Sequence, residues 1–189
     1  MEPHNRSETN YWNSVAVAGL IFGLVIFAIN IVGGYMTINS EATGTMFGEN
    51  MIMGLVGCLI ASFGGLLAVK MHVRDHPEPL LIGTGAIIGM ATGAVIALAS
   101  TVLGLIWNGI DPAFSDNLMQ ATIANIEAMD QIPEGQKEEM IDSVAAQMQR
   151  LQTAAGMLIA FVTSALLYGI LNMLTGMLGV RLFAAREEA

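Results

Sequence analysis

The sequence predicts an all-α, polytopic membrane protein with four transmembrane helices and an extramembrane amphipathic helical hairpin between the third and the fourth. The first observation is composition: 54% of the 189 residues are hydrophobic and only 12% are charged, whereas a soluble domain carries about 25% charged residues. The second is the presence of four apolar segments, each close to or above the roughly 20 residues that cross a bilayer core. The third is a single long polar segment, residues 111–152.

These segments divide the chain into five parts. We expect residues 1–13 to form a polar cytoplasmic leader, residues 14–110 the first three transmembrane helices, residues 111–152 the hairpin, residues 153–183 the fourth transmembrane helix and residues 184–189 a cytoplasmic tail. The polar start and the length of the first apolar run are unlike a cleaved signal peptide. The first helix is therefore expected to act as an uncleaved signal anchor.

The first span, residues 14–38, contains a close-packing motif and one strongly polar side chain. Gly19 and Gly23 form a GxxxG pattern, which places both glycines on one face and lets another helix backbone approach closely. Asn30 is either part of a transport path or, as we favour, an interhelical hydrogen-bond partner worth about 0.6 kcal/mol on average.

The second span, residues 51–69, leads into a turn, residues 70–79, that holds two candidate metal ligands. His72 and His76 are spaced i, i+4, so a helix continuing through both would bring two imidazoles together. Pro77 disfavours helical geometry at the residue before it, and a solvated turn at the headgroup level explains the same residues. No metal site is therefore predicted.

The third span organises the chain. No Asp, Glu, Lys or Arg occurs between Leu80 and Ile110. Gly85, Gly89 and Gly93 repeat every four residues and extend the GxxxG pattern along one helix face. We therefore expect this helix at the crowded centre of the bundle.

The polar segment, residues 111–152, predicts two amphipathic helices divided at Pro133. Asp111 and Pro112 are the residue types of an N-cap and a first-turn proline for the first of them. Apolar residues recur every three or four positions in both halves, and we favour packing of the two apolar faces on each other over packing on the membrane surface or on a partner. The polar faces carry the carboxylates of Asp116, Glu127, Asp130, Glu134, Glu138, Glu139 and Asp142.

Basic residues predict the topology. Placing the leader, the 70–79 turn and the tail on one side of the membrane leaves only Lys137 and Arg150 on the other. Because basic residues concentrate in cytoplasmic loops, we expect both termini in the cytoplasm and residues 111–152 in the periplasm or outside the cell. The basic residues collected on the cytoplasmic side are Arg6, Lys70, Arg74, Arg181 and Arg186.

Two short sequences carry a resemblance to a known family. The first helix contains Ala-Gly-Leu-Ile-Phe-Gly at residues 18–23, and the third span leaves the membrane with Ile-Asp-Pro-Ala-Phe at residues 110–114. Together with four spans and an amphipathic insertion before the last, they make the chain from Asn13 to Arg181 resemble the domain-of-unknown-function family 4199 of small bacterial four-helix membrane proteins. The resemblance implies this architecture and the bacterial inner membrane, and the family offers no established activity to transfer.

Several function classes are disfavoured by what the chain contains. Its net charge of −9 is unsuited to nucleic acid, which requires a basic patch. No Asp, Glu, His, Lys or Arg lies in the middle of a span, although membrane enzymes and pumps usually retain such residues for function. Cys58 is the single cysteine, so neither a disulfide nor a cysteine-based metal site is expected within the chain. We expect no enzymatic activity and no cofactor.

Three functions remain compatible with the sequence. The first is a non-enzymatic structural or accessory subunit of a membrane assembly, in contact with the lipid bilayer and with another membrane protein or further copies of itself. The second is a small oligomeric transporter or channel. The third is an envelope sensor whose acidic hairpin binds a cation through carboxylate oxygens. If the chain is a transporter or channel, its polar path would use Asn30, Thr92, Ser100 and Asn172.

Overall fold

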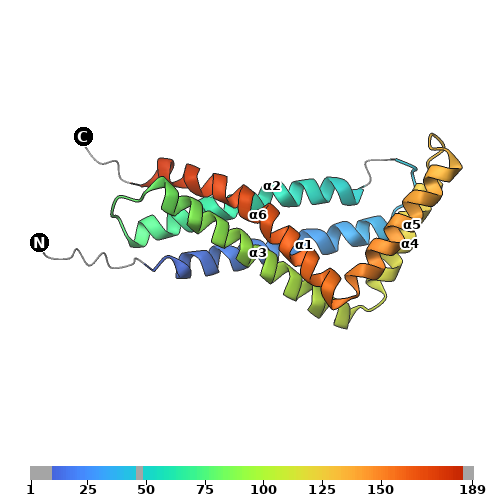
Figure 1. Cartoon of the computed structure of the whole chain (residues 1–189), viewed down its shortest axis with the longest axis horizontal. Coiled ribbons are helices and arrows are strands. Elements are labelled where there is room, and N and C mark those ends of the chain that lie inside the picture. Colours follow the sequence, from blue (N-terminus) through green and yellow to red (C-terminus); the bar gives the residue numbers. More distant parts are fainter. Residues whose placement is uncertain (1–9, 46–48, 185–189) are drawn as a thin grey trace, which may run out of the picture.

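The computed structural model describes residues 10–45 and 49–184, which form six helices and no strand. Residues 1–9 and 185–189, which include Arg6 and Arg186, lie outside the described residues. The prediction of an all-α protein is confirmed for the described part of the chain. In chain order (Figure 1) the helices are α1 (Trp12–Asn39), α2 (Glu49–Asp75), α3 (Ile82–Ile110), α4 (Phe114–Glu127), α5 (Glu134–Leu151) and α6 (Ala154–Phe183).

Four of these helices correspond to the predicted spans. α1, α3, α6 and the part of α2 from Met51 to Asp75 are long and apolar enough to cross a membrane. Large apolar side chains on their outer surfaces, such as Leu24, Leu98 and Leu166, are about half exposed or more. A helix satisfies its backbone hydrogen bonds internally, so this apolar exterior suits hydrocarbon surroundings.

α2 is longer than its apolar sequence suggests. The predicted span ends at Val69 because Lys70 is the first charged residue, whereas the helix continues to Asp75. Lys70 keeps its ammonium group at the bundle surface, 5.6 Å from the centroid of the Phe183 ring, so the charge does not interrupt the backbone hydrogen bonds. The helix ends just before Pro77, which lacks an N–H and restricts the residue before it.

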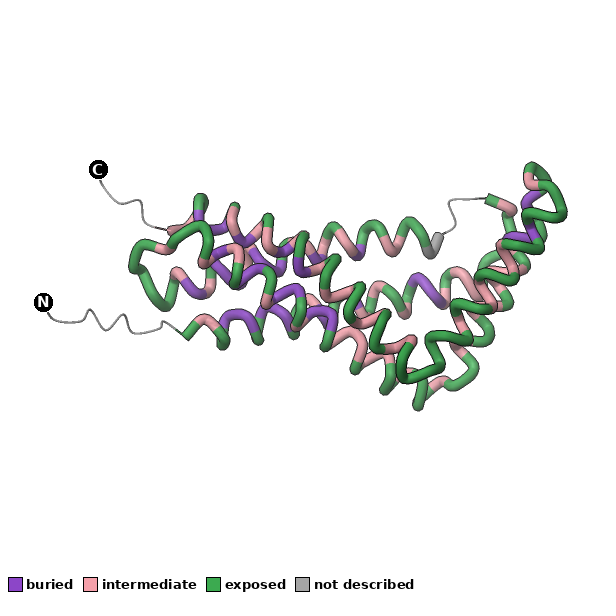
Figure 2. Tube along the Cα trace, in the orientation of Figure 1, coloured by how far each residue is buried: buried purple, intermediate pink, exposed green. Residues whose placement is uncertain are grey.

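α3 contacts α1, α2 and α6, and its contact with α6 is the most extensive in the chain. Buried residues concentrate in the half of the bundle that contains the α2–α3 turn (Figure 2). One apolar cluster there includes Val15, Val69 and Ile88, and a second one includes Ile26 and Ile96. The start of α1, the α2–α3 turn and the end of α6 lie at the same end of the bundle (Figure 1).

α4 and α5 lie at the opposite end and slant away from the bundle axis (Figure 1). They contact each other, but α4 also packs on α1 and α5 on α6, so the arrangement differs from a hairpin held only by its own apolar faces. The Lys137 ammonium, which is largely buried, donates to the Glu127 carbonyl oxygen at 3.1 Å and to Glu134 Oε1 at 2.9 Å. The bond to Glu127 joins the start of α5 to the end of α4.

Candidate functional site

A cavity of about 440 Å³ lies where α1, α3 and α6 meet α4 and the end of α5. α1 and α6 each pack on α3, but they form no extensive contact with each other, which leaves space between them. α4 crosses one end of this space, and no side chain of α2 lines it. The volume falls within the roughly 300 to 1,000 Å³ of small-molecule sites, so this cavity is the candidate binding site of the chain.

The cavity lining combines aromatic rings with uncharged polar groups. None of its residues is Asp, Glu, Lys or Arg. Trp107 Nε1 is buried and has no hydrogen-bond partner within residues 10–45 and 49–184. The aromatic residues are Phe27, Trp107, Phe114 and Phe161, and the polar ones are Asn30, Ser100, Thr101, Asn108, Ser115 and Ser164. Such a lining suits a neutral molecule.

The α3–α4 corner is fixed to α1 at the end of the cavity. The Tyr35 hydroxyl donates to Asp111 Oδ2 at 2.5 Å. The Tyr35 ring packs against Phe114, with 5.1 Å between ring centroids, and lies edge-on to Trp107 at 6.3 Å. A Cβ at Gly34 would come within 3.0 Å of the Phe114 ring, so a glycine is needed there for this close approach.

Asp111 does not cap α4, and the prediction that it forms the N-cap of the new helix is wrong. α4 begins at Phe114, preceded by Ala113, whose side chain makes no capping hydrogen bond. Asp111 instead ends α3, because its backbone N–H donates to the Trp107 carbonyl oxygen at 2.8 Å. Its carboxylate is engaged by Tyr35, a partner 76 positions away that local sequence does not reveal.

The four residues of the predicted polar path lie in different places. Asn30 and Ser100 line the cavity. Thr92 is fully buried elsewhere and its Oγ1 donates to the Ile88 carbonyl oxygen at 2.8 Å. Asn172 is also fully buried and belongs to the contact between α2 and α6. The structure thus brings two of the four residues to one cavity, and their use as a path stays a prediction.

Both ends of the Asn172 amide are hydrogen-bonded, one within α6 and the other to α2. Its Nδ2 donates to the Tyr168 carbonyl oxygen at 2.8 Å within α6, and its Oδ1 accepts from the backbone N–H of Gly65 in α2 at 2.6 Å. The neighbouring Thr175 hydroxyl donates to the Ser62 carbonyl oxygen, again from α6 to α2. Polar groups in this part of the bundle therefore bind helices to each other.

The predicted packing glycines lie at close approaches between helices. On α3, a Cβ added at Gly85, Gly89 or Gly93 would come within 3.0 Å of backbone atoms of α6. On α1, a Cβ added at Gly19 or Gly23 would come within 3.0 Å of side-chain atoms of α3.

Tyr35 is a site residue that the sequence does not mark as one. A single tyrosine near the end of a span is also typical of an interface residue, so its position gave no specific signal. The Ile-Asp-Pro-Ala-Phe motif was the available indication, because it supplies both partners of Tyr35, Asp111 and Phe114.

His72 and His76 lie close together at the end of α2. Their ring centroids are 5.0 Å apart, and the His76 backbone N–H donates to the His72 carbonyl oxygen at 2.9 Å. The nearby Asp75 carboxylate pairs with Arg74 at 3.1 Å. Within the described ranges no group of three or more His, Cys, Asp or Glu residues is placed to hold a metal ion, and this applies to the acidic residues of α4 and α5 as well.

Comparison with known proteins gives one match. A family model described as "Protein of unknown function (DUF4199)" matches residues 18–180. No curated protein and no solved structure matches the chain. The matched region includes most of α1, all of α2 to α5 and nearly all of α6, so it contains the cavity and the α3–α4 corner.

Proposed function

The chain belongs to the DUF4199 family, and we propose that it serves as a non-enzymatic structural or accessory subunit of a membrane assembly. The exposed apolar surface on the first turns of α2 supports this role. Met51, Ile52, Leu55 and Leu59 are each more than half exposed, and a Cβ at Gly54 would meet no atom within 4 Å. Gly85, Gly89 and Gly93 of α3 admit the backbone of α6, and Gly54 offers the same kind of surface to a helix of another protein.

The interior of the bundle also favours a structural role over a transport role. Thr92 and Asn172 are fully buried and their polar atoms are hydrogen-bonded within the chain. Gly85, Gly89 and Gly93 bring the backbones of α3 and α6 close together, which leaves little room for a continuous path between these two helices.

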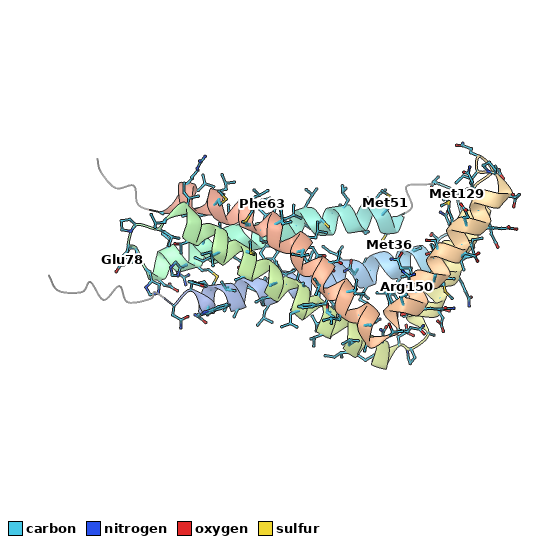
Figure 3. The ribbon with its side chains drawn as sticks, viewed as in Figure 1. Met36, Met51, Phe63, Glu78, Met129 and Arg150 are labelled. Atoms are coloured by element: carbon cyan, nitrogen blue, oxygen red, sulfur yellow. The ribbon has the colours of Figure 1, made fainter. Side chains whose placement is uncertain are left out.

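We further propose that the bundle lies in the bacterial inner membrane with both termini in the cytoplasm and α4 and α5 outside. Lys70, Arg74 and Arg181 belong to the ends of α2 and α6, at the end of the bundle where Glu78 lies (Figure 3). Met129 and Arg150 lie toward the opposite end in the same view. Under the positive-inside rule, the end with more basic residues faces the cytoplasm.

Cysteine accessibility in intact cells tests this topology. In a Cys58→Ser background, Asp130→Cys is expected to react with a membrane-impermeant maleimide in intact cells, whereas Glu78→Cys is expected to react only after lysis. Both native side chains are exposed, so folding does not hide either position from the reagent. We expect at least a tenfold difference in labelling before lysis. Labelling of Glu78→Cys but not of Asp130→Cys in intact cells would contradict the topology.

Native mass spectrometry of tagged protein, extracted gently from its own membrane, tests the subunit role. Wild-type protein is expected in a complex with a different membrane protein, and Gly54→Leu is expected to reduce recovery of that complex at least tenfold. The substitution fills the space next to α2 without a clash inside the chain. Gly83→Leu is the matched control, because a Cβ there also meets nothing within 4 Å, and it is expected to retain the complex.

Three outcomes would overturn the subunit proposal. Wild-type protein recovered alone would remove the partner on which it depends. A complex made only of copies of this chain would shift the weight to a transport or sensing function. A heteromeric complex that survives Gly54→Leu as well as Gly83→Leu would show that the first turns of α2 are not the contact surface.

A further inference from the structure

The cavity lies in the half of the bundle that is nearer to α4 and α5. Asn30 lies about 7 Å beyond the middle of α1, at a rise of 1.5 Å per residue. From there the lining extends to Ser115 and Leu118 of α4. The cavity is open on one side, since α1 and α6 do not close on each other. A molecule dissolved in the membrane therefore has a direct route to it.

One hydrogen-bonding side chain of the cavity has no partner within the described residues. The Asn30 side chain is exposed, and no hydrogen bond joins its amide to another described residue. Asn172, the other asparagine in the middle part of a span, is fully engaged by Tyr168 and Gly65. A polar group without a partner is costly in hydrocarbon, so the Asn30 amide favours an occupant that bears a hydrogen-bond acceptor.

The lining also limits the charge of the occupant. No ionisable residue lines the cavity, and the Asp111 carboxylate at the α3–α4 corner already accepts the hydroxyl of Tyr35. A buried ion without a counter-charge is strongly disfavoured. The rings of Phe27, Phe114 and Phe161 supply apolar walls for the remainder of the molecule.

From this geometry we infer that the cavity between α1, α3, α4 and α6 binds a neutral, membrane-soluble amphiphile, with its hydrogen-bond-accepting head at Asn30 and its apolar body against the aromatic rings. This inference is independent of the subunit role, because the cavity and the first turns of α2 share no residue.

Quenching of Trp107 fluorescence measures occupancy of the cavity directly. The chain has two tryptophans, so Trp12→Phe leaves Trp107 as the only one. The protein is placed in nanodiscs and titrated with a monoacylglycerol that carries bromine atoms on its chain, which is a neutral quencher with ester and hydroxyl oxygens. We expect saturable quenching at low mole fraction. The ionised fatty acid with the same brominated chain is expected to bind at least fivefold more weakly.

Two variants separate binding in the cavity from contact with bulk lipid. Gly104→Leu fills the cavity, since Gly104 lines it and a Cβ there meets nothing within 4 Å, and it is expected to remove the saturable component. Asn30→Leu removes the head-group donor and is expected to weaken binding at least fivefold. Gly83→Leu, at an equally open position outside the cavity, is expected to behave as the parent protein.

Quenching that rises linearly with mole fraction and is equal in the parent and Gly104→Leu would overturn the inference, because it would reflect bulk lipid alone. Equal affinity for the monoacylglycerol and the ionised fatty acid would overturn the assignment of a neutral ligand. Unchanged affinity in Asn30→Leu would overturn the placement of the head group. Circular dichroism of each variant establishes that it is folded as the parent is.

Discussion

Gly89→Ala is expected to destabilise the bundle by about 3 kcal/mol. The added methyl carbon would lie within 3.0 Å of the carbonyl carbon and oxygen of Asn172, and about as close to the Cα of Met173. These are backbone atoms, which cannot rotate away as the end of a side chain can. α3 and α6 would have to move apart, and the most extensive helix contact of the chain would be disturbed. Gly89→Leu is expected to have a still larger effect.

Unfolding in mild detergent, followed by circular dichroism as sodium dodecyl sulfate is added, measures this effect. Gly83→Ala is the matched control on the same helix, because its Cβ meets no atom within 4 Å. Alanine is a better helix former than glycine by up to about 1 kcal/mol, so the control is expected to be as stable as wild type or slightly more stable. If Gly89→Ala unfolds at the same detergent fraction as wild type, α3 is not the organising helix of the bundle.

Asn172→Leu is expected to destabilise the protein by about 2 kcal/mol, because the cost of leaving a buried polar partner unsatisfied is roughly 1 to 3 kcal/mol. Leucine has a similar branched shape but cannot accept the hydrogen bond from the Gly65 N–H of α2. It also releases the Tyr168 carbonyl oxygen, to which the Asn172 amide now donates. The same detergent titration measures the loss.

Asn30→Leu provides the comparison, since it makes the same substitution in another span. The Asn30 side chain is exposed and has no partner among the described residues, so its replacement is expected to change stability by no more than about 0.5 kcal/mol. Equal effects at the two positions, or no effect at Asn172, would show that the hydrogen bond from Gly65 does not stabilise the contact between α2 and α6.

Much of the fold could be predicted from the sequence. Each span can be recognised from its own residues, because a bilayer-crossing segment must be apolar over about 20 positions and must satisfy its backbone hydrogen bonds as a helix. Proline at position 133 similarly separated the two amphipathic helices. The Ile-Asp-Pro-Ala-Phe motif contributed to a family assignment that the match over residues 18–180 confirms.

Predictions from neighbouring residues failed where a side chain contacts a residue far away in sequence. The predicted second span ends at Val69, yet α2 continues to Asp75, with the Lys70 ammonium 5.6 Å from the centroid of the Phe183 ring. Asp111 has the residue type of an N-cap, yet its carboxylate is held by Tyr35, 76 positions away. Neither partner could be found by considering neighbours in sequence.

The sequence by itself determined the fold class, the four apolar spans, the two amphipathic helices and the family. Only the tertiary structure decided which helix faces which, that Asn172 accepts from Gly65, 107 positions away, and that Asn30 lies at a cavity instead. The physical reason is that lipid is as apolar as the interior of the bundle. A leucine that faces hydrocarbon and one that faces another helix are therefore alike in sequence, and hydrophobic periodicity, which reveals the buried face of a soluble helix, does not distinguish the two faces here.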